Sequence, residues 1–295
     1  MMEAMAERGA SRTAVLVCQG RAVADGRLAV GRFADPTAAV LLQPDEREAV
    51  DQARAGVAPD GWADRLEYEW LTANAEVMAP RTVAIDDAVR ECDHPQVVVL
   101  GAGLDGRAWR MPELAGVDVY EVDHPASQDD KRARAGDLGE PAARLHWVPV
   151  DFEHDDLTGA LDEAGHDPAR PTTWVWEGVV AYLTPAEVEA TATVVAGRSA
   201  PGSRLVLNYQ APSRLAGVGL AVTRLASQLG GRPSPTATEP RRSAWTPAEV
   251  RRLCGDRGLR VVRDDDLVTL AGRLGMPVTR ARSVRHGRVA VADRP

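Results

Sequence analysis

Three acids, Asp123, Asp151 and Glu177, are the residues of this sequence best placed to bind a charged cofactor. Each one ends a short run rich in β-branched or aromatic residues, which is typical of a buried strand. In an open α/β sheet, ligands bind outside the carboxyl ends of the strands. We therefore expect the acids to meet at one edge, where Asp123 holds a ribose diol, Asp151 lies near an adenine edge, and Glu177 faces a positive group of the ligand.

A glycine turn precedes these acids. Gly101-x-Gly103-x-x-Gly106 follows the apolar run Val97–Leu100, and glycines at this point let the backbone turn tightly and approach a ligand. Asp123 follows Gly103 at the distance of about 20 residues that is typical of a ribose-binding acid. By itself the turn fits a nicotinamide or flavin enzyme, an S-adenosylmethionine-dependent methyltransferase, or a turn without a ligand.

The acids favour one of these cofactors. A nicotinamide dinucleotide contains a pyrophosphate, which prefers a helix N-terminus and nearby cations. S-adenosylmethionine has no phosphate, and it carries a sulfonium and an amino group that carboxylates attract. We therefore favour S-adenosylmethionine, and keep an NAD(P)-dependent oxidoreductase and a non-catalytic S-adenosylmethionine-binding protein as alternatives.

The elements that position these residues follow a regular rhythm. After the glycine turn, predicted strands alternate with predicted helices, which is the pattern of an α/β fold with a doubly wound parallel sheet. The predicted strands lie at residues 117–123, 145–151, 172–177 and 203–209. The predicted helices lie at residues 107–111, 126–135, 157–164 and 185–197. A capping-box pattern at Thr246 opens another helix, and 259–263 and 284–292 are candidate last strands.

The remaining segments suggest a division of the chain. Predicted helices at 11–22, 37–42 and 61–78, and a separate one from 81 to about 92, precede the first strand. The predicted parts are an N-terminal helical extension or cap (1–92, loose at 1–10), a cofactor-binding core (93–210), a lid insertion after the fifth strand (211–245) and the C-terminal part of the core (246–295). We expect the lid to close over the cofactor and build the acceptor pocket.

Composition excludes several other classes of function. The formal net charge of −8 and the pI of about 5.4 argue against nucleic-acid or acidic-membrane partners. The three cysteines, Cys18, Cys92 and Cys254, are far apart, so we expect neither a disulfide framework nor a metal site. No apolar run approaches the length of a membrane span, and we expect a cytoplasmic protein, monomeric or homodimeric.

From about residue 11 to residue 209, the sequence resembles the leucine carboxyl methyltransferase-like family of class I methyltransferases. The similarity is carried by Gly-Ala-Gly-Leu-Asp (101–105) together with Glu-Val-Asp-His-Pro (121–125) at their spacing. Further matching stretches are Ser11-x-Thr13-Ala14, Arg21-Ala22, Asp35-Pro36, Arg81-Thr82, Trp109-Arg110, Asp151-Phe152 and 177–184. The resemblance implies a mostly parallel seven-stranded sheet and S-adenosyl-L-methionine as the cofactor, with S-adenosyl-L-homocysteine as the product.

The resemblance also implies which residues hold the methionine part of the cofactor. Gly101, Ala102 and Gly103 are expected to pass under it. Arg81 is expected to pair with its carboxylate, and Glu177 to lie near its amino group.

Further roles are implied for the rest of the cofactor and for methyl transfer. Asp123 is expected to hold the ribose, whereas Asp151 and Phe152 hold and cover the adenine. Tyr182 is expected close to the methyl-transfer site, where it and Glu177 act as positioning residues. His124 is expected to cap the turn with Pro125, and it would act as a general base only for a phenol or hydroxyl acceptor.

The methyl acceptor is the least constrained prediction. The family includes the enzyme that methylates the C-terminal leucine of a protein phosphatase, and bacterial members that tailor polyketides and other small acids. The phosphatase enzyme has a lysine near the position of Gln19, whereas the nearest cation here is Arg21. We therefore favour O-methylation of a small-molecule acid of secondary metabolism, most simply on a carboxylate, which is ionised at neutral pH and needs no base. Arg241 or Arg242 is a candidate to attract such an anion.

Overall fold

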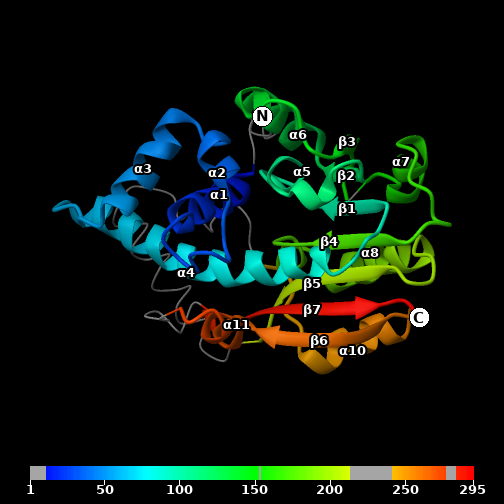
Figure 1. The fold of residues 1–295 in the computed structure, drawn as a ribbon. Coiled ribbons are helices and arrows are strands. Elements are labelled where there is room, and N and C mark those ends of the chain that lie inside the picture. Colours follow the sequence, from blue (N-terminus) through cyan, green and yellow to red (C-terminus); the bar gives the residue numbers. More distant parts are fainter. Residues whose placement is uncertain (1–10, 153, 213–240, 277–283) are drawn as a thin grey trace, which may run out of the picture.

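The protein folds around one seven-stranded sheet, seen in a computed structural model that describes residues 11–152, 154–212, 241–276 and 284–295 (Figure 1). The strand order is β3-β2-β1-β4-β5-β7-β6. Neighbours among the first five strands are parallel, and β7 is antiparallel to both β5 and β6. The strands are β1 (Gln96–Leu100), β2 (Asp118–Asp123), β3 (Arg144–Pro149), β4 (Thr172–Trp176), β5 (Arg204–Gln210), β6 (Arg260–Asp266) and β7 (Gly287–Asp293).

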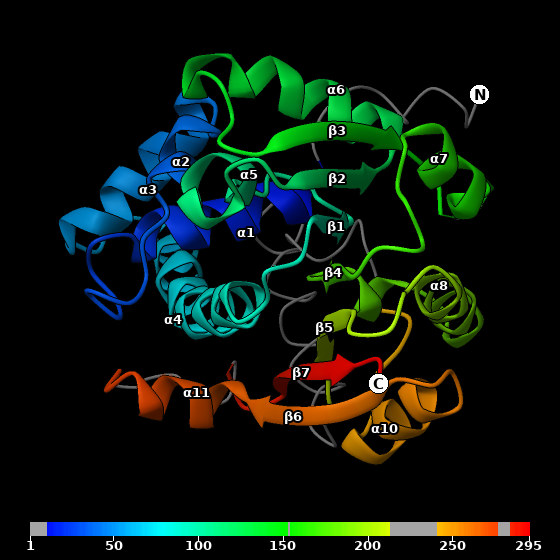
Figure 2. The same ribbon diagram turned by 45° about the vertical axis from the view of Figure 1, so that its right-hand side comes forward.

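Helices cover both faces of this sheet (Figure 2). The main ones are α1 (Arg12–Ala24), α2 (Pro36–Val40), α3 (Pro44–Ala55), α4 (Trp62–Arg90), α5 (Arg107–Arg110), α6 (Pro125–Arg134), α7 (Leu157–Glu163), α8 (Pro185–Gly197), α10 (Pro247–Gly255) and α11 (Leu267–Arg273). Short 3₁₀ turns are η1 (Pro112–Leu114), η2 (Ala135–Leu138) and η3 (Val180–Tyr182). The alternation confirms the predicted doubly wound α/β fold.

The side-chain alternation of each strand builds two separate cores. Val98 and Leu100 of β1 pack in a cluster with residues of α7, α8 and α10. Val97 and Val99 pack instead with the C-terminal part of α4, with α5 and with α11. Because successive side chains of a strand point to opposite faces, an unbroken apolar strand is buried on both sides.

The N-terminal helices form a third apolar cluster beside the sheet, built by α1 to α4. Here the prediction of two helices at 61–78 and from 81 is wrong. A single 29-residue helix, α4, continues through Pro80. A proline inside a helix costs about 3 kcal/mol, but Ala79 and Val83 on either side of it are buried, and this packing keeps the two halves in line.

Other differences concern short elements. The structure contains α3 and α11, which we did not predict, and α5 is only 4 residues long. The capping box at Thr246 is confirmed, because its side chain accepts a hydrogen bond from the Glu249 backbone N–H while Glu249 accepts one from the Thr246 backbone N–H. The predicted loose N-terminus and most of the predicted lid lie outside the described residues.

Candidate functional site

The candidate site lies beyond the carboxyl ends of β1, β2 and β4, where the strand order reverses. Leu100 pairs in register with Val122 of β2 and with Trp176 of β4. The next residues, Gly101, Asp123 and Glu177, therefore lie side by side at this edge of the sheet. Such a switch point is where open α/β sheets bind ligands, so the predicted meeting of the glycine turn with two of the three acids is confirmed.

The glycine turn is tied to the end of β2 by hydrogen bonds. The backbone N–H groups of Gly101 and Ala102 donate to the Val122 carbonyl at 2.8 and 3.1 Å. The Asp123 carboxylate accepts from the Gly103 N–H at 2.5 Å and from the His124 N–H at 2.7 Å. Burial raises the pKa of Asp123, although these two backbone donors favour its charged form. Asp123 thus shapes the turn at the carboxyl end of β2.

The glycines are also required by the packing of the protein itself. Gly101 and Gly103 have φ of +67° and +46°, a region that side chains disfavour. A Cβ at Gly101 would lie 2.1 Å from Val179 Cγ2, and one at Gly103 would lie 2.9 Å from Ala14 Cβ. The fingerprint is therefore explained partly by neighbouring elements that close over the turn.

Beside the glycine turn lies a cluster of buried charges that we call the charge network. It consists of four arginines and four acids, so its formal charges balance. Its members are Arg21, Asp35, Arg81, Asp86, Asp105, Arg107, Arg110 and Glu177. None of these side chains is more than 8% exposed. Burying charges at this density requires each to be paired, because an unpaired buried charge is strongly destabilising.

Glu177 joins two arginines of this network. Its Oε1 accepts from Arg81 Nε at 2.7 Å, and its Oε2 accepts from Arg107 Nη1 at 2.8 Å. Burial alone would raise the pKa of Glu177, but the two guanidinium groups outweigh burial and the pKa lies below its usual value. Glu177 is therefore ionised at neutral pH, and both of its oxygens are engaged by arginine.

Arg81, like Arg107, has one buried Nη2 without a hydrogen-bond partner among the described residues. The Arg81 side chain starts from α4 and pairs with Glu177, the residue that follows β4. Desolvation by burial lowers the pKa of Arg81, so an anion at Nη2 would restore interactions that the guanidinium lost on leaving water.

Arg107 and Arg110, on α5, connect the rest of the network. Arg107 Nε donates to Asp86 at 2.7 Å, and its Nη1 also contacts Asp105. Arg110 donates to both oxygens of Asp86, at 2.6 and 2.9 Å. Burial would raise the pKa of Asp86 and Asp105, but the arginines hold both values below normal.

The Arg21 side chain is buried and binds other groups of the protein. It contacts Asp35 at 2.9 Å and donates to the Leu104 carbonyl at 2.5 Å, which joins α1 to the glycine turn. Gln19 is also buried and donates to the Glu46 carbonyl at 2.8 Å. Neither side chain is placed to meet a substrate as a free polar group.

The other predicted site residues follow the carboxyl ends of β2, β3 and β4. Asp151 follows β3, and its carboxylate contacts His154 at 3.0 Å. Phe152 packs on the apolar core, and Tyr182 is a half-buried residue of η3. His124 is exposed and its ring accepts a hydrogen bond from the Ala126 N–H at 3.2 Å, which confirms the predicted cap.

The chain that follows residue 240 is attached to the turn that carries Tyr182. The Arg242 N–H donates to the Ala181 carbonyl at 2.7 Å, and Ser243 Oγ donates to the Val180 carbonyl at 2.8 Å. The Trp245 N–H donates to the Gln210 carbonyl at 2.9 Å, at the end of β5. These bonds hold this segment against η3 and the carboxyl end of β5.

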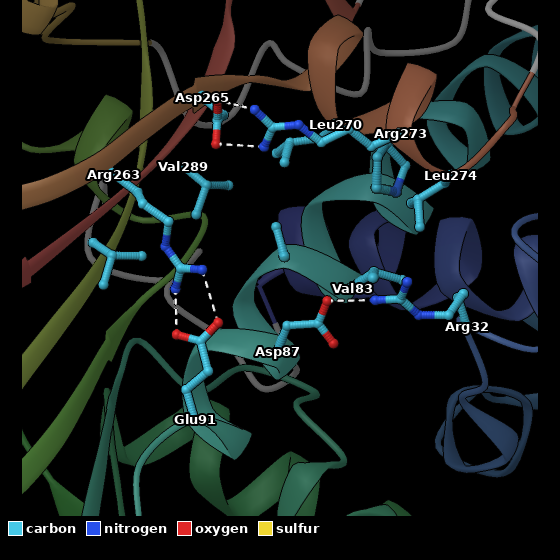
Figure 3. A pocket seen from close by; sticks show the side chains of 13 residues that line it. Arg32, Val83, Asp87, Glu91, Arg263, Asp265, Leu270, Arg273, Leu274 and Val289 are labelled. Atoms are coloured by element: carbon cyan, nitrogen blue, oxygen red, sulfur yellow. Dashed lines mark hydrogen bonds and ion pairs between the residues drawn. The ribbon is translucent and has the colours of Figure 1, made fainter.

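A separate hollow of about 200 Å³ lies between α4, β6, β7 and α11 (Figure 3). It uses a face of α4 formed by Pro80, Val83, Ala84, Asp87 and Glu91, not the positions of the charge network. Its arginines are paired with acids across an apolar floor. The pairs are Arg32–Asp87, Arg263–Glu91 and Arg273–Asp265. The hollow contains none of the predicted site residues.

Sequence reasoning missed most of the charge network. Of its members, we expected site roles only for Arg81 and Glu177. Arg21, Asp35, Asp105 and Arg110 stood in stretches that carried the family resemblance, which was a usable signal. Asp86 and Arg107 gave no such signal, because a charge within a helical pattern normally predicts a solvent-exposed face.

Comparisons with known proteins agree with this geometry. A solved structure described as a "putative methyltransferase" from Thermobifida fusca YX is 16% identical, covers 99% of this chain and 96% of its own, and has a TM-score of 0.57. The fold is that of the class I S-adenosylmethionine-dependent methyltransferases. Residues 14–196 match the model of the leucine carboxyl methyltransferase family, and the chain belongs to that family.

Curated relatives match over a smaller part of their length. A "Putative S-adenosyl-L-methionine-dependent methyltransferase" from Mycobacterium sp. (strain JLS) is 39% identical over 159 residues, covering 54% of this chain and 53% of the relative. One of the same name from Mycolicibacterium gilvum (strain PYR-GCK) is 38% identical over 205 residues, covering 67% and 65%. The chain thus spans about half to two thirds of the length of these relatives. Among the described residues, no helix combines the length and apolar composition needed to cross a membrane.

Proposed function

We propose that this protein transfers the methyl group of S-adenosyl-L-methionine to a carboxylate oxygen of a small-molecule acid. The observation that carries the proposal is the buried Arg81 guanidinium, whose Nη2 has no partner among the described residues. It pairs with Glu177, which follows β4 at the same edge of the sheet as the glycine turn and Asp123. The family membership and the names of the relatives support the same cofactor.

The residues present fit this cofactor. An anion-seeking nitrogen at Arg81 suits the methionine carboxylate, and the carboxylate of Glu177, which is ionised at neutral pH, suits a neighbouring amino group. Asp123, at the end of β2, is the acceptor for the ribose hydroxyls. Asp151 and Phe152 are the proposed contacts of the adenine. The proposed floor under the methionine part of the cofactor is formed by Gly101, Ala102 and Gly103.

The proposed mechanism needs no general base from the protein when the acceptor is a carboxylate. The cofactor supplies an electrophilic methyl group on a sulfonium. An acceptor carboxylate is ionised at neutral pH and attacks without a general base. The protein then aligns the acceptor with the methyl group and excludes water. Tyr182 and Glu177 are the proposed positioning residues of this step, and His124, exposed and engaged as a cap, is needed only if the acceptor is a hydroxyl.

The test is methyl transfer from cofactor labelled in its methyl group to a panel of small carboxylic acids and phenols. A carboxyl methyl ester releases labelled methanol in alkali, whereas a methyl ether does not. Alkali-labile label with release of S-adenosylhomocysteine supports the proposal. Alkali-stable label overturns the carboxylate acceptor, and stabilisation by NADH but not by S-adenosylhomocysteine overturns the cofactor. A role in secondary metabolism, a cytoplasmic location and a monomeric or dimeric state stay predictions.

A further inference from the structure

Arg107 is the most connected member of the charge network. Its guanidinium meets Asp86 of α4, Asp105 after the glycine turn, and Glu177 after β4. Its side chain is only 2% exposed, and it lies behind Glu177 as seen from Arg81, because the two arginines hold different oxygens of that carboxylate. Arg107 is therefore placed to act on a ligand through Glu177.

The geometry makes the orientation of Arg81 depend on Arg107. Arg81 donates from Nε to Glu177 Oε1, which fixes the plane of its guanidinium and leaves Nη2 unpartnered among the described residues. The other oxygen of Glu177, Oε2, accepts from Arg107 Nη1 at 2.8 Å. Arg107 is in turn held at Nε by Asp86, which is on the same helix as Arg81. These contacts form a closed ring that joins α4, α5 and Glu177, the residue that follows β4.

We propose that Arg107 is a positioning residue that presents Arg81, through Glu177, to the carboxylate of the methionine part of the cofactor. This inference rests on the cofactor placement proposed above. A planar guanidinium is needed at this position, because it can bond three carboxylates in fixed directions, whereas a lysine ammonium offers a single charged point. Arg107 thus sets affinity for one part of the cofactor without touching it.

The experiment compares two ligands in calorimetric titrations with purified full-length protein. S-adenosylhomocysteine contains the amino and carboxylate groups, whereas 5′-methylthioadenosine keeps the adenine, ribose and sulfur but lacks them. Arg107→Lys should weaken S-adenosylhomocysteine binding about tenfold or more, the loss expected for a misdirected charged hydrogen bond. Binding of 5′-methylthioadenosine should change by less than about twofold, because the side-chain partners of Arg107 are Asp86, Asp105 and Glu177 and do not include Asp123, the proposed ribose acceptor.

Arg110→Lys is the matched control. Arg110 lies on the same helix, is equally buried, and also pairs with Asp86, but it does not contact Glu177. The Arg110→Lys variant should lower the melting temperature, as Arg107→Lys does. Its affinities for S-adenosylhomocysteine and 5′-methylthioadenosine should stay near those of the wild type. Equal weakening of both ligands by Arg107→Lys, or the same ligand pattern for Arg110→Lys, would mean a general structural defect and overturn the inference.

Arg81→Lys separates this inference from the cofactor placement. Loss of S-adenosylhomocysteine affinity in Arg81→Lys but not in Arg107→Lys overturns the role of Arg107 and leaves the placement standing. If neither variant weakens S-adenosylhomocysteine, the placement itself is wrong. If Arg107→Lys does not fold, Asp86→Asn removes the charge that holds Arg107 Nε, and it should weaken S-adenosylhomocysteine selectively; unchanged binding there contradicts the proposal.

Discussion

Replacing Glu177 with glutamine removes one negative charge from the charge network and changes its shape very little. The network holds four arginines and four acids in the wild type, so the variant leaves one buried positive charge uncompensated. Arg81 at 2.7 Å and Arg107 at 2.8 Å both lose an ionic partner. Removing one member of a buried ion pair costs about 3–5 kcal/mol, and we expect a decrease of this size in the free energy of unfolding at pH 7.

The pH dependence of this effect has a definite sign. The pKa of Glu177 in the folded protein is below its usual value because Arg107 and Arg81 outweigh burial. Its contribution to stability is therefore fully present above the unfolded pKa of about 4.3 and is lost as the pH falls through the folded pKa. The difference between wild type and Glu177→Gln should narrow below about pH 4.

Urea unfolding followed by tryptophan fluorescence at pH 7 and at pH values below 4 measures both effects. Glu113→Gln is the control, because Glu113 pairs with Arg90 at 2.7 Å but is 44% exposed. An exposed pair contributes about 0–1 kcal/mol. If Glu177→Gln cost no more than this control at pH 7, the argument that the charge network requires balanced pairing would be refuted.

Three further predictions follow from single contacts. Asp123→Asn should weaken S-adenosylhomocysteine and 5′-methylthioadenosine alike, by about tenfold or more, and calorimetry showing selective loss of the former would contradict a ribose role. Gly101→Ala should lower the free energy of unfolding by about 2–4 kcal/mol through its positive φ and the collision with Val179; Val179→Ala in the same chain should recover part of this loss, and no recovery would exclude the collision. Burial raises the pKa of Glu121 to about 7 although Lys131 lowers it. The folded protein therefore keeps a proton on Glu121 that the unfolded chain releases near pH 4.3. The free energy of unfolding of the wild type should consequently fall as the pH rises between about 4.3 and 7. Glu121→Gln should flatten this fall in unfolding curves measured across that range, and an unchanged slope would contradict the assignment.

Local patterns alone predicted the sheet and its edge. A strand with four consecutive apolar residues that is followed by glycines must be buried and must turn, whatever surrounds it. When a helix connects two parallel strands of one sheet, the crossover is right-handed in almost every case. For these reasons the amino-acid sequence by itself was enough to place Gly101, Asp123 and Glu177 at one edge of the sheet.

The partners of the charges were decided only by the tertiary structure. Asp86 and Arg107 are 21 residues apart and Arg107 and Glu177 are 70 residues apart, and no local pattern distinguishes a charge that will be buried from one that will stay in water. The same holds for α4, where local chemistry predicted a break at Pro80 and packing on both sides kept the helix continuous. Local sequence determines the backbone conformations that are accessible, whereas desolvation and pairing depend on groups that only folding brings together.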